Sequence, residues 1–163
     1  MSLVVVGCSK KSDAEPAIPA NSIQLSDNGQ VVVFGSPTAV VETNALGVKQ
    51  LTIDASTADN HQISLSVTDR QGVETPRTYR GASAGSAYTL PITNYSTNCR
   101  SLVLGTQLYR FYIDSAPDLE VVVKSVDTST HTVSGTFSGI YTLGCDSRKI
   151  TNGQFNLPYT VKP

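Results

Sequence analysis

Several residues in this 163-residue chain have side chains and spacings that could support catalysis or ligand binding. The run Gly81-Ala82-Ser83-Ala84-Gly85 fits G-x-S-x-G, the pattern that presents a serine nucleophile in many hydrolases. That pattern works only where a buried strand leads into a helix, with an acid and a histidine brought in from further along the chain. Residues 86–92 have the pattern of another strand. We therefore expect a loop of small residues here and no nucleophile.

The histidines and carboxylates offer acid and base chemistry, but the sequence does not bring them together. His61 opens an expected strand and His131 lies in an expected hairpin turn, so we expect surface positions for both. The carboxylates are scattered, and a glycosidase pair could form only by tertiary approach. The histidines are distant from every cysteine, and the chain has no EF-hand ladder, P-loop or dinucleotide fingerprint. We expect no metal, no cofactor and no enzymatic activity.

Tyrosines are the side chains best suited to stack on a sugar, because the chain contains no Trp. Tyr109 and Tyr112 belong to one expected strand, in which alternation sends them to opposite faces. Tyr95 lies in an expected loop. We name these residues as candidates for ligand contact, with an ordinary surface or packing role as the alternative.

The cysteine near the N-terminus has the surroundings of a lipid attachment site. The run Val5-Val6-Gly7-Cys8 resembles a bacterial lipobox, in which apolar and small residues precede the acylated cysteine. Cleavage before Cys8 frees an amino group, so that more than one acyl chain can anchor the protein. The apolar stretch is short and no basic stretch precedes it, so we expect a shortened signal peptide that follows a cloning remnant. The alternative is a short strand with an incidental buried thiol.

The lipobox interpretation has consequences for the rest of the chain. Residues 9–21 are polar, contain prolines and lack periodicity, as a tether does. We expect residues 1–21 to be lipobox remnant and tether, and residues 22–163 to be a single domain. A protein anchored in this way works in an oxidising compartment, which makes Cys99 and Cys145 a natural disulfide. Two free thiols are the alternative.

Composition and charge narrow the choice of partners and of fold class. The net charge is -1 and 15% of the residues are charged, so no basic field attracts nucleic acid. No apolar run approaches the roughly 20 residues of a membrane-spanning helix. Ser, Thr, Asn and Val are abundant, a mixture that favours strands over helices.

Alternation of apolar and polar residues predicts an all-β domain. The pattern is cleanest in residues 61–68, where Ile63, Leu65 and Val67 share one face that must be buried. Asn28-Gly29 tolerates the positive φ of a tight hairpin turn. At most one helical turn is expected, near residues 93–102. The other expected strands are residues 22–26, 30–35, 38–43, 51–55, 87–93, 104–114, 119–127, 131–141 and 149–161. About ten short strands separated by turn residues predict a two-sheet antiparallel sandwich, with a closed β-barrel as the alternative.

The last third of the chain carries a resemblance to a protein family. The stretches DLEVVV at residues 118–123, VSGTFSG at residues 133–139 and ITNGQFNLPY at residues 150–159 resemble small cell-envelope lipoproteins of Bacteroidota. The resemblance implies a β-sandwich anchored in the outer membrane, periplasmic or surface-exposed, with no assigned activity and no catalytic residue.

The same stretches have a packing explanation that needs no family. Gly135 and Gly139 alternate with core residues and make room for aromatic neighbours across the sheet. Asn152-Gly153 offers a bulge or a turn that would point Phe155, Leu157 and Tyr159 into the core. We expect packing roles for these residues and no contact with a ligand.

These observations lead to a functional expectation with two alternatives. We expect a non-enzymatic, lipid-anchored envelope protein that meets the membrane through Cys8 and binds a glycan or a surface protein. A structural, fimbria-like subunit that assembles by strand addition is the first alternative, and it requires an open sheet edge. A small hydrolase is the second.

Overall fold

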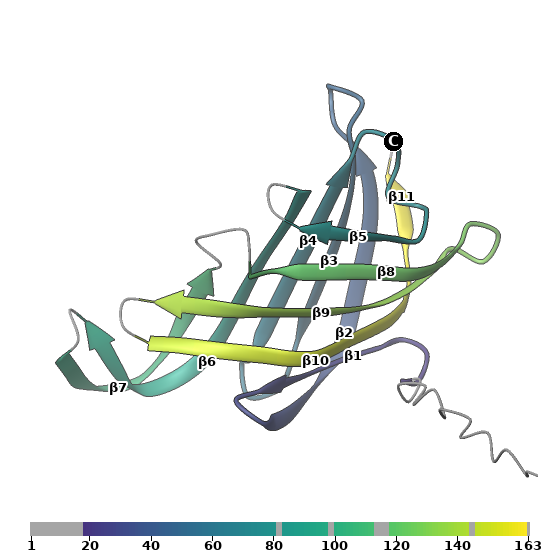
Figure 1. Ribbon diagram of the computed structural model, residues 1–163. Helices are drawn as coiled ribbons and strands as arrows, with labels where there is room; N and C mark the ends of the chain where they lie inside the picture. The colour runs from purple at the N-terminus through teal and green to yellow at the C-terminus, as the bar shows by residue number, and fades with distance from the viewer. Residues whose placement is uncertain (1–17, 81–82, 98–99, 113–117, 144–145, 163) are drawn as a thin grey trace, which may run out of the picture.

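The computed structural model describes the chain as an all-β domain (Figure 1). It describes residues 18–80, 83–97, 100–112, 118–143 and 146–162, with the backbone alone for residues 87–97, 100–112, 142, 143 and 146. The strands are β1 (Ser22–Asp27), β2 (Gln30–Thr43), β3 (Lys49–Ser56), β4 (Gln62–Asp69), β5 (Arg77–Arg80), β6 (Ala84–Thr97), β7 (Arg100–Tyr112), β8 (Glu120–Asp127), β9 (Thr132–Leu143), β10 (Asp146–Pro158) and β11 (Thr160–Lys162).

The strands form one sheet that nearly closes into a barrel. The order is β10-β1-β2-β3-β4-β6-β7-β9, and β9 pairs back with β10 while β8 and β5 continue the sheet beyond β9. All these pairings are antiparallel, and only the short β11 pairs in parallel with β2. Among the described residues, β7 pairs with β9 at Tyr112 and Thr142. Figure 1 shows β5, β8, β9 and β10 running across β2, β3 and β4.

The predicted two-sheet sandwich is wrong, because β1 joins what would be its two layers. β1 pairs with β2 on one side, as in Ile23 with Phe34, and with β10 on the other, as in Ile23 with Phe155. Alternating inward and outward side chains look the same in a sandwich and in a barrel. The pairings that distinguish the two architectures join the start of the chain to its end, and local patterns carry no information about them.

Several strands are longer than predicted, because bulges let them bend without ending. The expected strands at residues 30–35 and 38–43 are one strand, β2, whose register shifts between Gly35 and Thr38. Ser36 in this bulge has a positive φ of 44°. The helical turn expected near residues 93–102 is also wrong, since the described residues there belong to β6 and β7.

The curved sheet encloses one apolar core, and the main expectations about that core are confirmed. Ile63, Leu65 and Val67 are all buried, as predicted. The expected hairpin turn at Asn28-Gly29 is present, with positive φ at both residues. Burying each large apolar side chain contributes about 1.5–3 kcal/mol, so these inward rows supply much of the stability of the domain.

Two glycines let the chain pass close to aromatic rings in this core. Gly135 in β9 pairs with Phe155 in β10, and Gly153 in β10 pairs with Phe137 in β9. A Cβ atom on Gly135 would lie 2.1 Å from the carbonyl oxygen of Val122 and 2.5 Å from the Phe155 ring. A Cβ atom on Gly153 would lie 2.4 Å from the Phe137 carbonyl oxygen. The predicted packing role of this region is confirmed.

The predicted bulge beside Gly153 is confirmed as well. The register between β9 and β10 shifts between Ile150 and Gly153, and Asn152 has a positive φ of 50°. The extra residue re-aims the strand, so that Phe155, Leu157 and, beyond β10, Tyr159 are buried.

Replacing Gly135 should therefore destabilise the domain. We expect Gly135→Ala to lower the free energy of unfolding by about 1–3 kcal/mol or more, because the backbone of β8 and the Phe155 ring must shift. Gly35→Ala is the matched control, since the nearest atom to its new Cβ is 4.0 Å away. Urea denaturation measures both variants, and equal losses would contradict the close-approach explanation.

Candidate functional site: two polar rims of the barrel

Inward-facing rows of the sheet end in charged side chains at both ends of the barrel. Lys49 is in phase with the buried Leu51 of β3, and Asp69 is in phase with the buried Val67 of β4. We call the end that carries Lys49, Asp69, Gln71, Glu74, Arg77 and Tyr79 the β4–β5 rim. The opposite end carries Asp27, Thr57, Asp59, His61 and Arg148, and we call it the β3–β4 rim.

At the β4–β5 rim, the connection from β4 to β5 folds back over the end of the barrel. Val73 in this connection is 1% exposed and belongs to the core. Glu74, which follows it, forms an ion pair with Lys49 of β3. The connection is thus held by an apolar anchor and by an ion pair to a neighbouring strand.

The start of this connection is held by a second polar network. The guanidinium group of Arg77 pairs with the Asp69 carboxylate and donates a hydrogen bond of 2.9 Å to the Gln71 side-chain oxygen. The Gln71 backbone N–H donates a hydrogen bond of 2.8 Å to the Asp69 carboxylate. Three side chains therefore restrain one another before any ligand arrives.

Tyr79 brings a buried hydroxyl group to the same rim. Its side chain is 2% exposed, and its hydroxyl has no hydrogen-bond partner among the described residues. Burial raises the pKa of this phenol, the negative charge of Asp69 raises it further, and Arg77 opposes the shift. The hydroxyl thus remains a neutral donor at neutral pH.

Tyr159 lies close to Glu74 at this end of the barrel. Burial raises the pKa of its phenol, and the charge of Glu74 adds to the effect. The ring of His131 meets the Tyr159 ring edge-on, with centroids 5.3 Å apart. His131 is exposed, as predicted, so its ring covers the buried tyrosine from the solvent side.

A shallow depression of about 400 Å³ opens at the β4–β5 rim. Its lining offers hydroxyl groups, an amide, one carboxylate and two guanidinium groups, all of which form hydrogen bonds. The lining residues are Thr68, Asp69, Arg70, Gln71, Arg77, Thr78, Tyr79 and Ser83. Arg70 is exposed and comes directly after β4.

A second depression, of about 300 Å³, lies over β8, β9 and β10 and includes Glu120 and Gly153 in its lining. Each of the two depressions has one carboxylate in its lining, and each carboxylate pairs with an arginine. Asp69 pairs with Arg77, and Glu120 pairs with Arg80. Neither depression therefore presents the two carboxyl groups that glycoside hydrolysis requires.

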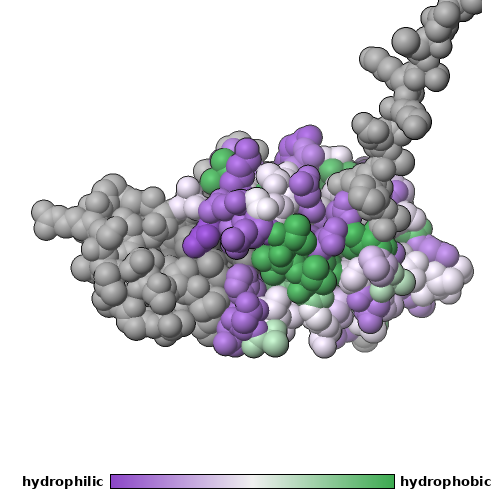
Figure 2. Space-filling view, turned by 90° about the horizontal axis from the view of Figure 1, so that it is seen from below, coloured by the Kyte–Doolittle hydropathy of each residue, from purple (hydrophilic) through white to green (hydrophobic). Residues whose placement is uncertain are grey.

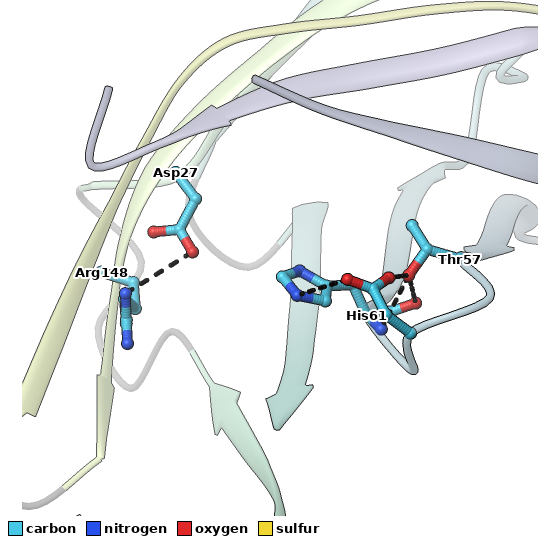
Figure 3. A network of polar contacts seen from close by, with 5 residues as sticks. Asp27, Thr57, His61 and Arg148 are labelled. Atoms are coloured by element: carbon cyan, nitrogen blue, oxygen red, sulfur yellow. Dashed lines mark hydrogen bonds and ion pairs between the residues drawn. The ribbon is translucent and has the colours of Figure 1, made fainter. Parts of the chain in front are cut away.

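The β3–β4 rim carries a separate polar network (Figure 3). Arg148 Nη1 lies 3.7 Å from the carboxylate of Asp27, whose side chain is 7% exposed. His61 Nε2 lies 3.6 Å from the carboxylate of Asp59, and the His61 backbone N–H donates a hydrogen bond of 2.9 Å to Thr57 Oγ1. In Figure 3, the imidazole ring points toward the side on which Asp27 and Arg148 lie.

A hydrogen bond at the β3–β4 rim favours the ionised form of the Asp59 carboxylate. The Thr57 hydroxyl donates a hydrogen bond to Asp59, and this contact is the main reason that the pKa of Asp59 is lowered. His61 lies at the rim as a half-buried residue, less exposed than the surface position expected for it. The alternation of side chains along this segment explains the difference, because His61 lies two positions before the buried Ile63 and therefore on the same face.

The strand expected after Ser83 is present, but the loop expected over the whole G-x-S-x-G run is wrong, because Ala84 and Gly85 already belong to β6. Ser83 is followed directly by β6, so a strand stands where the nucleophile motif requires a helix. Its hydroxyl donates a hydrogen bond of 2.8 Å to the Arg80 carbonyl oxygen. Gly81 and Ala82 lie outside the described residues.

The tyrosines proposed for ligand contact lie on β6 and β7. Tyr95 belongs to β6, opposite Leu102 of β7, so the loop expected for it is wrong. Tyr109 and Tyr112 both belong to β7, as predicted. The side chains of all three lie outside the described part of the structure, and their proposed contacts stay predictions.

The three cysteine predictions also fall outside the described residues. Cys8, Cys99 and Cys145 all lie outside the described residues. Lipid attachment at Cys8 and a disulfide between Cys99 and Cys145 therefore stay predictions. Within the part of the chain that the structure describes, no group of three or more His, Cys, Asp and Glu side chains could hold a metal ion. None of the described residues forms a helix with the length and hydrophobicity needed to cross a membrane.

Sequence reasoning missed both rims, although a usable signal was present. Lys49, His61 and Asp69 each lie two positions beyond the last buried apolar residue of a strand, on the same face as that residue. A charged or titratable residue in that position must lie inward at the end of a strand, where it meets the other strand ends. The partners of these residues come from other strands and could not be read from that signal.

Two buried tyrosines differ in the hydrogen bonding of their hydroxyl groups, and this difference can be tested by substitution. We expect Tyr79→Phe to leave the free energy of unfolding unchanged or slightly higher, because the lost hydroxyl has no partner among the described residues. Tyr141 is the control, since its hydroxyl shares a hydrogen bond of 2.6 Å with Ser86 and burial raises its pKa to about 12. Tyr141→Phe should cost about 1 kcal/mol in urea denaturation. An equal cost for both variants would contradict the assignment.

Comparisons with known protein families, curated proteins and solved structures found no match for this chain. The resemblance to Bacteroidota lipoproteins therefore stays a prediction.

Proposed function

We propose that this chain is a non-enzymatic, lipid-anchored protein of the cell envelope that binds a glycan at the β4–β5 rim. The observation that carries the proposal is the depression of about 400 Å³ and its polar lining. Each hydroxyl group of a sugar both donates and accepts hydrogen bonds, so a lining of hydroxyl, amide, carboxylate and guanidinium groups complements it.

The order already present in the rim supports binding. Asp69, Gln71 and Arg77 restrain one another through the hydrogen bonds and the ion pair described above. Side chains that are fixed before binding lose little conformational entropy when a ligand arrives.

The carboxylates favour binding over acid and base catalysis. A general acid needs a pKa raised toward neutrality. Asp59 and Asp127 have pKa values lowered by hydrogen bonds in turns, chiefly from the Thr57 hydroxyl and the Ser129 hydroxyl respectively. Both groups are therefore stabilised as anions at neutral pH. Neither of these two carboxylates is therefore suited to the role of a general acid.

The lipid anchor remains part of the proposal. The described chain begins at Ile18, whose carbonyl oxygen accepts a hydrogen bond of 3.3 Å from the Asn156 side chain in β10. This contact ties the start of the described chain to β10. Acylation at Cys8 would then hold the domain at the outer membrane, on its periplasmic or its exposed side.

A second candidate function is supported by a different feature. Residues 30–34 of β2 pair with β1 on one side, and no described strand pairs with their other side. Such an edge can accept an added strand, as a structural subunit requires. Strand addition and glycan binding use different surfaces, so they can be tested separately.

Glycan binding is tested by removing one charged contact from the depression. The full chain should bind members of a glycan array, and Arg70→Gln should weaken the affinity for them about tenfold or more in calorimetry. Lys162→Gln is the matched control, since it removes one exposed positive charge on β11. Absence of binding across the array, or equal weakening by both variants, would contradict this site.

The anchor is tested by mass spectrometry of the protein expressed with its signal peptide in a bacterial host that acylates lipoproteins. We expect the mature chain to begin at Cys8 and to carry acyl groups there. Cys8→Ser should abolish both the modification and membrane association. An unmodified Cys8 in the membrane fraction would rule out the lipid anchor.

A further inference from the structure

β2 runs past its neighbour β3 and leaves part of one edge open. Its pairing with β3 begins at Gly35, whereas its pairing with β1 covers residues 30–34. No other described strand pairs with the free side of these residues. In Figure 1, the β1–β2 hairpin lies at the lower edge of the sheet. We call the free side of residues 30–34 the β2 edge.

The hairpin geometry determines which backbone groups face this edge. The turn has two residues, Asn28 and Gly29, and Asp27 pairs with Gln30 across it. The residues that flank such a turn form a hydrogen-bonded pair, and the pattern then alternates along the strand. Gln30, Val32 and Phe34 therefore bond toward β1, while the N–H and C=O groups of Val31 and Val33 point toward the β2 edge.

The side chains at this edge are apolar and exposed. Val31 is 71% exposed and Val33 is 61% exposed on the outer face of the hairpin. Figure 2 views the molecule from the side on which this hairpin lies and shows a hydrophobic patch near the middle of that face. Natural proteins protect open edges with charges, as β5 does with Arg77 and Arg80. The β2 edge has no charged residue between Gln30 and Gly35.

We propose that the β2 edge pairs with the β2 edge of a second copy of this chain, antiparallel and centred on Val32. The inference rests on strand addition, the second candidate above. In this register, Val31 lies opposite the partner's Val33 and Val32 lies opposite the partner's Val32. Each pair of Val31 and Val33 exchanges both of its backbone hydrogen bonds, so every edge group of these residues is satisfied.

The chemistry of the edge fits a second copy. A twofold axis at Val32 makes the surface self-complementary, as an isologous interface must be. The pairing brings valine against valine on the outer face and places no like charges opposite one another. This edge is best matched by an uncharged, apolar strand, and residues 30–34 of a second copy are such a strand. A single short edge gives a weak dimer that depends on concentration.

Membrane anchoring would strengthen such a weak contact. Two copies tethered to one membrane have a high effective concentration, so a weak edge contact becomes occupied without any new interaction. Without the anchor, the dimer should appear only at high protein concentration. The assembly would also place two β4–β5 rims in one particle, which increases avidity for a repeating glycan.

The test uses charge pairs that only this register brings together. In a variant with Val31→Lys and Val33→Lys, each introduced lysine faces a lysine of the other copy. In a variant with Val31→Lys and Val33→Glu, each lysine faces a glutamate. Sedimentation equilibrium at low salt should show dimerisation of the wild type and of the opposite-charge variant, and at least tenfold weaker association of the like-charge variant. Val161→Lys on β11 is the control and should dimerise like the wild type.

Amide hydrogen exchange gives an independent readout of the same register. At high concentration, the Val31 and Val33 amides should gain protection, while the Val32 amide is already protected by β1. A monomeric wild type at all concentrations, or equal association of the two charge variants, would overturn the inference. A monomer that binds a synthetic QVVVFG peptide at this edge would also overturn it, while leaving strand addition in place. Failure of glycan binding at the β4–β5 rim has no bearing on these outcomes.

Discussion

The structure depends on the hydrogen bonding of β1 to both of its neighbours. This strand of six residues lies between β2 on one side and β10 on the other, and its Ile23 and Leu25 are fully buried. Without the pairing to β10, the sheet would be open at this seam, and its two halves would be joined only through β6, β7 and β9. With it, the sheet is continuous around the core. Closing this seam joins distant parts of the chain, which carries a large loop-closure entropy and should make it a late step of folding.

A sheet that curls this far has to solve packing problems on its inner face. The bulges in β2 and β10 bend long strands, and Gly135 and Gly153 let the backbone of neighbouring strands approach the rings of Phe155 and Phe137. The described interior is consequently filled with apolar side chains. In the part of the domain whose side chains are described, the surfaces left for a ligand are therefore the rims and the outer face, and the proposed functions concern the β4–β5 rim and the β2 edge.

The sequence predicted those features that local chemistry determines. Alternation identified the buried face of Ile63, Leu65 and Val67, and the Asn28-Gly29 turn followed from the backbone freedom of its residues. The strand that follows Ser83 was also expected from the local pattern. Each of these conclusions needs information from only a few consecutive residues.

Most of the features that were missed require a second segment. The choice between sandwich and barrel was decided by β1 meeting β10, and no property of residues 22–27 alone indicates that partner. The placement of Tyr95 in a loop failed because pairing with β7 extended β6 through residues with weak strand patterns. The rim networks join Lys49 to Glu74 and Asp27 to Arg148, across distances in sequence that periodicity cannot bridge.

The same seam explains why one edge of the sheet remains open. β2 pairs with β1 in its first half and with β3 in its second half. The bulge between Gly35 and Thr38 separates the two paired regions. β3 ends at Ser56, so nothing in the described sheet continues alongside residues 30–34. A closed barrel would have no edge to offer. Because this barrel is closed by a hairpin that projects beyond β3, closure of the core and exposure of an apolar edge are two consequences of one arrangement.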